Sequence, residues 1–193
     1  TIPYGIFIRY SKTFSRKNLY KFITSSIEKH CKPNQNIINI GAGGKVKEAL
    51  LNKKLNFKEI DIDKKRNPDF VCDIENMSIF KDDSIDIFFC IEVLEHVKNP
   101  FNAIKEIQRT LKPGGILIGS TPFIFPIHDE PYDFYRYTKY GLENMFSSFK
   151  KIKLIEKNSY IEAVYVILVR LINTGTIKQR LVGILLFPIY LIL

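Results

Sequence analysis

Cysteine is scarce in this sequence of 193 residues, and the three that occur, Cys31, Cys72 and Cys90, lie far apart. They form neither a Cys-x-x-Cys pair nor an even-numbered set, which disfavours a zinc site and a disulfide framework. We therefore expect buried thiols and a reducing, cytoplasmic location, and we predict no metal site in the chain.

The sequence also lacks an apolar run of the roughly 20 residues that a membrane-spanning helix needs. Its two longest apolar stretches, 161–172 and 181–193, are joined by a short basic linker. Segment 158–193 is therefore predicted to be helical and truncated. It could form a lid over an acceptor, which is the favoured interpretation, a peripheral contact with the inner face of a membrane through 161–193, or a dimer surface.

No long block of like charges occurs, although Lys and Arg number 29 against 20 for Asp and Glu, which gives a net charge of +9. Scattered lysines are typical of a solvated surface, while the net charge would suit an acidic partner. The hydrophobic content of 46% and the chain length fit one globular domain. The chain begins without Met or a secretory signal and ends in an apolar run, so we expect a fragment.

Strand-like and helix-like patterns alternate along the chain. Between an N-terminal helical segment, 1–34, and the apolar segment 158–193, we place a core at 35–157. Strands are predicted at 37–40, 57–62, 70–72, 85–91, 116–119 and 151–155, and helices at 16–31, 45–52, 100–111 and 138–146. This alternation predicts a doubly wound α/β fold, with a mainly parallel sheet between helices and a ligand beyond the strand ends where strand order reverses.

A glycine turn, Gly41-x-Gly43, follows the first predicted strand and opens a helix. Glycines let the backbone approach a ligand, and a helix amino terminus favours anionic groups. Asp61 lies 61 − 41 = 20 residues later, at the end of the next strand, where a carboxylate can accept hydrogen bonds from ribose hydroxyls; Asp63 is the neighbouring candidate. Val46 replaces the third glycine of a dinucleotide fingerprint, which counts against NAD.

Asp73 follows the third predicted strand. Its carboxylate could accept from an adenine amino group, with the next residue's backbone against the ring. A helix N-cap is an equal alternative for an aspartate at this position.

In order along the chain, five motifs resemble those of the class I methyltransferases, specifically the methyltransferase type 11 group, over about residues 35–146. They are Asn39-Ile40-Gly41-Ala42-Gly43-Gly44, Asp61, Asp73-Ile74-Glu75-Asn76, the Ile-Glu-Val-Leu-Glu-His-Val segment at 91–97, and Leu111-Lys112-Pro113-Gly114-Gly115. The resemblance implies S-adenosyl-L-methionine as methyl donor. It also implies a Rossmann-like sheet of seven strands whose antiparallel last strand we expect to be missing here.

The resemblance also implies roles for particular residues. Those expected at the donor are Asn39, Gly41, Ala42 and Gly43 beside the methionine part, Asp61 and Ile62 at the ribose, Asp73 and Ile74 at the adenine, and Cys90, Ile91 and Glu92 on the floor near the sulfonium. Asn39 and Lys45 depart from the acid and the glycine usual in the family. An amide at 39 loses charge-assisted hydrogen bonding, so weaker donor binding would follow.

The segment 121–138 gathers aromatic and polar side chains after the fifth predicted strand, as suits the mouth of an acceptor site. His128 is a candidate general base, oriented by Asp129 or Asp133; an equal alternative is that it only pins the loop. Arg136 could pair with an acceptor anion or with Asp133. Tyr132, Asp133, Tyr135 and Arg136 are the predicted acceptor contacts. His96 is assigned a structural role.

The function predicted is methyl transfer from S-adenosylmethionine to a small-molecule or glycan acceptor, including a lipid-linked sugar. A catalytically inactive methyltransferase-like binding module is the alternative, and RNA methylation is the third. Residues 90–93 carry no Asn-Pro-Pro-Tyr-type motif, which disfavours base methylation by nucleotide flipping, and a nucleic-acid partner is disfavoured in general. The sequence leaves the oligomeric state open.

Overall fold

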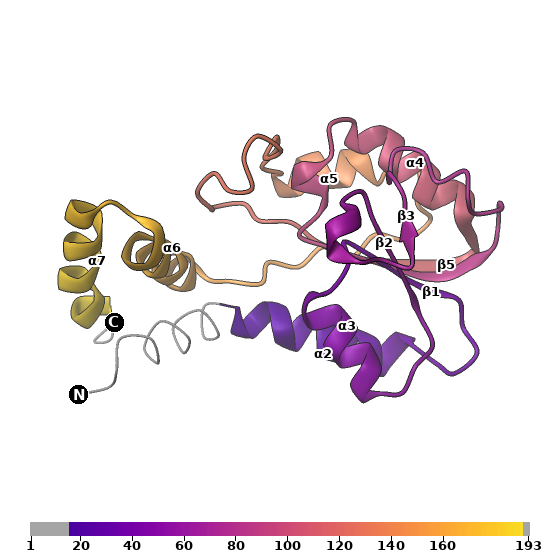
Figure 1. Ribbon diagram of the computed structural model, residues 1–193, viewed down its shortest axis with the longest axis horizontal. Coiled ribbons are helices and arrows are strands. Elements are labelled where there is room, and N and C mark those ends of the chain that lie inside the picture. The colour runs from indigo at the N-terminus through magenta and orange to yellow at the C-terminus, as the bar shows by residue number, and fades with distance from the viewer. Residues whose placement is uncertain (1–15, 191–193) are drawn as a thin grey trace. The chain divides into compact units, whose positions relative to one another are not determined.

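The computed structural model describes residues 16–190 (Figure 1). Residues 1–15 of the predicted N-terminal segment and residues 191–193 lie outside the described part. Contacts divide the chain into two compact units. One comprises Ile23–Phe123 with Ile127–Leu154 and holds the sheet; the described remainder of the other is 16–22, Ile124–Pro126 and 155–190.

The sheet unit is built on five parallel strands in the order β3-β2-β1-β4-β5. Their bounds are β1 Ile37–Ile40, β2 Lys58–Asp61, β3 Phe70–Val71, β4 Ile85–Ile91 and β5 Leu111–Ser120. Strand order reverses between β1 and β4, which pair directly with Ile40 opposite Cys90. This arrangement confirms the predicted doubly wound fold and places the reversal point, where such folds bind ligands, beside the glycine turn.

Helices cover both faces of this sheet (Figure 1). They are α2 Lys17–His30, α3 Gly44–Asn52, α4 Pro100–Thr110 and α5 Lys139–Met145, with short 3₁₀ turns η1 Lys64–Arg66 and η2 Leu94–His96. α3 lies on the opposite face from α4. Pro100 starts α4, where its missing N–H costs nothing, and Ala103, Ile104 and Ile107 form the buried stripe.

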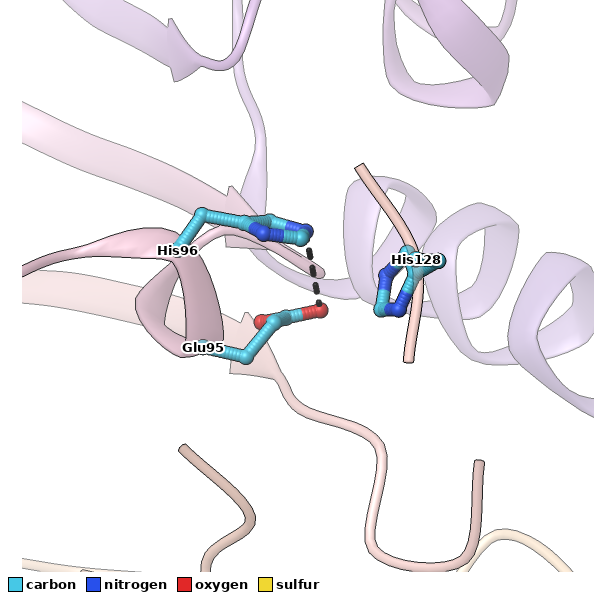
Figure 2. A group of neighbouring side chains, drawn as sticks. All are labelled: Glu95, His96 and His128. Carbon is cyan, nitrogen blue, oxygen red and sulfur yellow. Dashed lines mark ion pairs between the residues drawn. The ribbon is translucent and has the colours of Figure 1, made fainter. Parts of the chain in front are cut away.

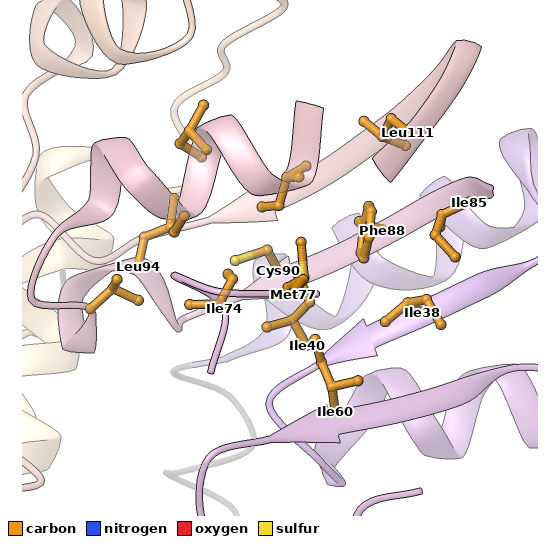
Figure 3. Close-up of a cluster of buried hydrophobic side chains, with 14 of the residues drawn as sticks. Ile38, Ile40, Ile60, Ile74, Met77, Ile85, Phe88, Cys90, Leu94 and Leu111 are labelled. Carbon is orange, nitrogen blue, oxygen red and sulfur yellow. The ribbon is translucent and has the colours of Figure 1, made fainter. Parts of the chain in front are cut away.

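The core between the sheet and α4 is apolar and closely packed (Figure 3). It includes Ile38, Ile60, Phe88 and Cys90 from the strands and Met77 from the loop after β3. Burial of this many side chains along β1, β2 and β4 fixes the strand ends rigidly. The residues that follow those ends are thereby positioned.

The strand predictions differ from the structure at two places. β5 begins at Leu111 rather than 116, because Leu111 pairs with Ile85 before an irregularity leads to the pair Ile87–Ile116. The predicted strand at 151–155 is wrong: that stretch has no strand, and Ile152 and Ile155 are exposed, so nothing pairs with it among the described residues.

The other unit contains a helical hairpin of α6 Tyr160–Thr174 and α7 Ile177–Tyr190. A capping box between Ser159 and Glu162 starts α6, and the Asn18 amide donates to Glu162 Oε1 at 2.8 Å. Gly183 allows close packing, since a Cβ there would lie 2.8 Å from Ile172 Cγ1. Within the described residues, neither helix nor any other is long and apolar enough to cross a bilayer.

Candidate active site

The glycine turn after β1 has a backbone that only glycine adopts readily. Gly41 has φ +83°, and Gly43 has φ +94° with ψ −150°. A Cβ on Gly41 would lie 2.9 Å from Val93 Cγ2, so the turn touches the residue that precedes η2. A Cβ on Gly43 would meet nothing within 4 Å, so the space over this glycine is open to a ligand.

A buried carboxylate from β2 supports the turn from below. Glu59 Oε1 accepts hydrogen bonds from the Gly43 N–H at 2.7 Å and from the Asn39 amide at 2.9 Å, while Lys47 Nζ lies 2.6 Å from Oε2. Burial opposes ionisation, yet the hydrogen bonds from Lys47, Gly43 and Asn39 together hold the pKa of Glu59 below its usual value. Sequence analysis missed Glu59, because three of the four residues of β2 are charged and the sequence alone does not show which of them is buried.

Asp61 ends β2 and lies against the same turn. Its Oδ2 accepts from the Ala42 N–H and its Oδ1 from the Asp63 N–H, both at 2.8 Å, and Arg66 Nε stands 3.7 Å from Oδ2. The carboxylate is therefore held where β2 ends, as a ribose ligand requires. Ile62, the next residue, leaves 70% of its surface exposed although it is apolar.

The other residues predicted to bind the methyl donor differ in whether the side chain or only the main chain can face a ligand. Asp73 Oδ1 accepts from the Glu75 N–H at 2.8 Å within a turn, and no helix begins there, so Asp73 is not the helix N-cap of the alternative prediction. The side chains of Ile74 and Cys90 are buried in the core, so only their main chains can face a ligand. Ile91 is partly buried, and Glu92 has φ +54° with its Oε1 accepting from Ser120 Oγ at 2.6 Å.

The segment predicted to bind the acceptor is anchored to the main chain of η2. The N–H groups of Phe134 and Tyr135 donate to Glu95 O, at 2.8 and 3.2 Å, and Tyr137 Oη donates to Leu94 O at 2.9 Å. Burial raises the pKa of Tyr137, which keeps its hydroxyl a donor. The segment's backbone is therefore fixed beside the turn that touches Gly41.

Asp133 organises the polar centre of this segment. Arg136 pairs with both of its oxygens, at 2.6 and 2.7 Å, and the His128 N–H donates to Oδ2 at 3.0 Å. The Arg136 guanidinium holds the pKa of Asp133 far below its usual range. His128 Nδ1 lies 3.2 Å from Asp133 Oδ2, so Asp133 is the carboxylate beside this imidazole. Asp129 instead lies 3.9 Å from His96 Nε2.

A second histidine and a buried glutamate adjoin His128 (Figure 2). The His96 ring is edge-on to the His128 ring with centroids 4.8 Å apart, and His96 Nε2 lies 3.9 Å from Glu95 Oε1. Glu95 is fully buried, and no other residue among 16–190 donates a hydrogen bond to either carboxylate oxygen. Burial, with the charge of Glu92 added, raises the pKa of Glu95 to about 8.

Comparison with protein families identifies the core. A family model described as a methyltransferase domain, of the type 11 group, matches residues 39–119, which include the glycine turn, Asp61 and η2. The chain contains a class I methyltransferase domain. This domain class implies S-adenosylmethionine as cofactor, and the open space over Gly43 and the fixed carboxylate of Asp61 fit that molecule.

Curated relatives match only a short part of this chain. The thiol S-methyltransferase TMT1B of Rattus norvegicus is 46% identical over 43 residues, 22% of this chain and 18% of the relative. The Mus musculus protein of the same name is 44% identical over an equal length. The matched stretch thus spans less than a fifth of the length of these relatives.

Solved structures share the fold of this chain. A Haloferax volcanii protein in complex with the Trm112 methyltransferase activator has a TM-score of 0.55 at 18% identity, covering 75% of this chain and 72% of that one. An S-adenosylmethionine-dependent methyltransferase from Aquifex aeolicus scores 0.54 at 15% identity, covering 72% and 86%. The [4+2]-cyclase SpnF scores 0.55 at 16% identity, covering 67% and 55%.

Proposed function

We propose that this chain transfers a methyl group from S-adenosylmethionine to a hydroxyl-bearing small molecule or glycan. One observation carries the proposal: the ligand-ready glycine turn contacts Val93, the residue before η2, and η2 anchors the acceptor segment. In the proposed site, the donor and the acceptor would meet at the edge where the β1–β4 order reverses.

Different residues would bind the methyl donor and the acceptor. S-adenosylmethionine supplies an electrophilic methyl group on its sulfonium. Asp61 and the turn at 41–43 would hold the donor, and the backbone at Ile74 would face its adenine. Tyr132 and Tyr135, both exposed on the acceptor segment, would bind the acceptor, whereas Arg136 and Asp133 pair with each other and would hold the shape of the segment. Alignment of the two reactants contributes most of the acceleration in such a displacement.

The geometry also bears on the alternative of an inactive binding module. Asn39 gave that alternative its main support, because the family usually has an acid there. Glu59 supplies a carboxylate at 2.9 Å from the Asn39 amide, so a negative charge beneath the turn is retained. The fold relative named as a [4+2]-cyclase shows that the architecture alone does not specify the reaction.

The proposal is tested by titrating the chain calorimetrically with S-adenosylhomocysteine. We expect micromolar binding that Asp61→Ala abolishes, because the ribose loses its acceptor. Asp63→Ala is the matched control, since Asp63 caps η1 through the Lys65 N–H and should leave affinity nearly unchanged. Absence of binding by the folded wild-type chain, or greater loss in Asp63→Ala than in Asp61→Ala, would contradict the donor site.

A further inference from the structure

Three potential metal ligands from two separate segments converge beside η2. One ligand atom from each of Glu95, His96 and His128 lies within 4.8 Å of the others (Figure 2). Two ligands bound to one ion at bonds of about 2.1 Å stand roughly 3.4 Å apart in tetrahedral geometry. For all three to bind one ion, the ligand atoms would need to approach one another by up to about 1.4 Å.

The burial of the Glu95 carboxyl group supports a bound cation at this position. Its carboxylate is fully buried without a hydrogen bond from any other residue of the described part of the chain. An isolated carboxyl group buried in this way stays neutral, and its charged form is tolerated when it is paired or bound to a metal ion. Glu92, whose charge acts on Glu95, adds a second negative group to the surroundings.

The histidines are oriented as metal ligands commonly are. His96 Nδ1 lies 2.8 Å from Tyr132 O; because a carbonyl oxygen only accepts, Nδ1 carries the proton and Nε2 presents its lone pair toward Glu95. The Asp133 carboxylate near His128 Nδ1 favours the corresponding tautomer there. A carbonyl or carboxylate behind each ring is the typical outer shell of a metal-bound histidine.

We infer that Glu95, His96 and His128 bind a divalent transition-metal ion through one carboxylate and two imidazoles. Two histidines with one carboxylate suit zinc, iron, cobalt or manganese and leave positions open. The sequence prediction of no metal site rested on the cysteines, which take no part. The role of the ion in catalysis rests on the proposed function. The ion would hold the acceptor's hydroxyl oxygen while the new O–CH₃ bond forms and the S–CH₃ bond breaks, and the hydroxyl proton would pass to Asp129 or solvent.

The test is calorimetric and spectroscopic titration of the chelator-treated full chain with Co²⁺ and Zn²⁺. We expect one ion per chain, visible Co²⁺ absorption of a nitrogen and oxygen site, and at least about tenfold weaker binding in Glu95→Gln, His96→Gln and His128→Gln. His30→Gln, which removes the only other histidine, should leave binding unchanged. Thermal unfolding and S-adenosylhomocysteine binding establish that each variant is folded.

Different results would contradict the metal site and the proposed methyltransferase function. Folded wild type that binds S-adenosylhomocysteine but no metal, or whose metal affinity falls equally in His30→Gln, overturns the metal site and leaves the donor site intact. Metal binding that depends on Glu95, His96 and His128 without S-adenosylhomocysteine binding overturns the proposed function alone.

Discussion

Asn39 departs from the acidic residue that the family usually has at the end of its first strand, and its neighbour supplies the reason. The amide donates to Glu59 Oε1 at 2.9 Å, and both side chains are buried. A carboxylate at position 39 would face another carboxylate across that distance. The negative charge beneath the glycine turn has thus moved to β2, a change that no reading of position 39 alone could anticipate.

Asn39→Asp should lower the free energy of unfolding by about 2 kcal/mol, because it replaces a buried donor with a second anion. Urea unfolding at neutral pH measures the loss. The exchanged pair, Asn39→Asp with Glu59→Gln, restores one amide and one carboxylate and should recover much of the stability. A double variant no more stable than the single one would count against this pairing.

Glu59 also makes the free energy of unfolding depend on pH. Because its pKa is lowered in the folded chain, its contribution is fully present above the unfolded value, about 4.3, and is lost as pH falls through the lower folded value. Wild type should therefore lose more unfolding free energy than Glu59→Gln between pH 6 and about pH 3. Glu48→Gln, at an exposed pair with Lys45, should follow wild type. Parallel curves for wild type and Glu59→Gln would refute this role.

Among the elements, those defined by local periodicity were the ones that sequence predicted well. α4 carries its apolar residues at helical spacing, and β4 is apolar except for Asp86, so both were predicted nearly to the residue. The stretch 151–155 has a strand-like composition but finds no partner strand, which composition cannot reveal. The anchoring of 121–138 on η2 was likewise hidden, because its hydrogen bonds join residues about 40 positions apart.

The anchor of the acceptor segment can be tested at Tyr137. Tyr137→Phe leaves the Leu94 carbonyl without this donor and should cost about 1 kcal/mol. It should also speed proteolytic cleavage within 121–138. Thermal unfolding and limited proteolysis give the two readouts. Tyr135→Phe removes a more exposed hydroxyl, bonded to Lys98 O at 3.0 Å, and should have a smaller effect; a larger one would contradict the assignment of Tyr137 as the main anchor.

The chain has a net charge of +9, and helix α7 of the hairpin has an exposed apolar surface. α7 exposes Leu181, Ile184 and Leu185, and Lys178 and Arg180 lie at its start. Basic side chains beside exposed apolar ones are typical of helices that lie in a membrane interface. The predicted membrane contact of 161–193 therefore remains a prediction with a direct test.

We expect the chain to float with anionic vesicles, and to do so less at high salt because exposed charges are screened. Leu185→Glu, at a side chain 74% exposed, should reduce flotation, because it places a charge on the apolar surface. Ile79→Glu, at an exposed position in the sheet unit, is the control and should float like wild type. Failure of the wild-type chain to float would remove the membrane contact.

The attachment of 121–138 to η2 has a consequence for how such a protein diversifies. The attachment points on η2 are carbonyl groups of Leu94 and Glu95, which every residue type possesses. The exposed side chains of Ile127 and Tyr132 can therefore be exchanged without releasing the segment from its support. A lineage can in this way keep the support of the segment unchanged while mutation varies its exposed side chains one at a time.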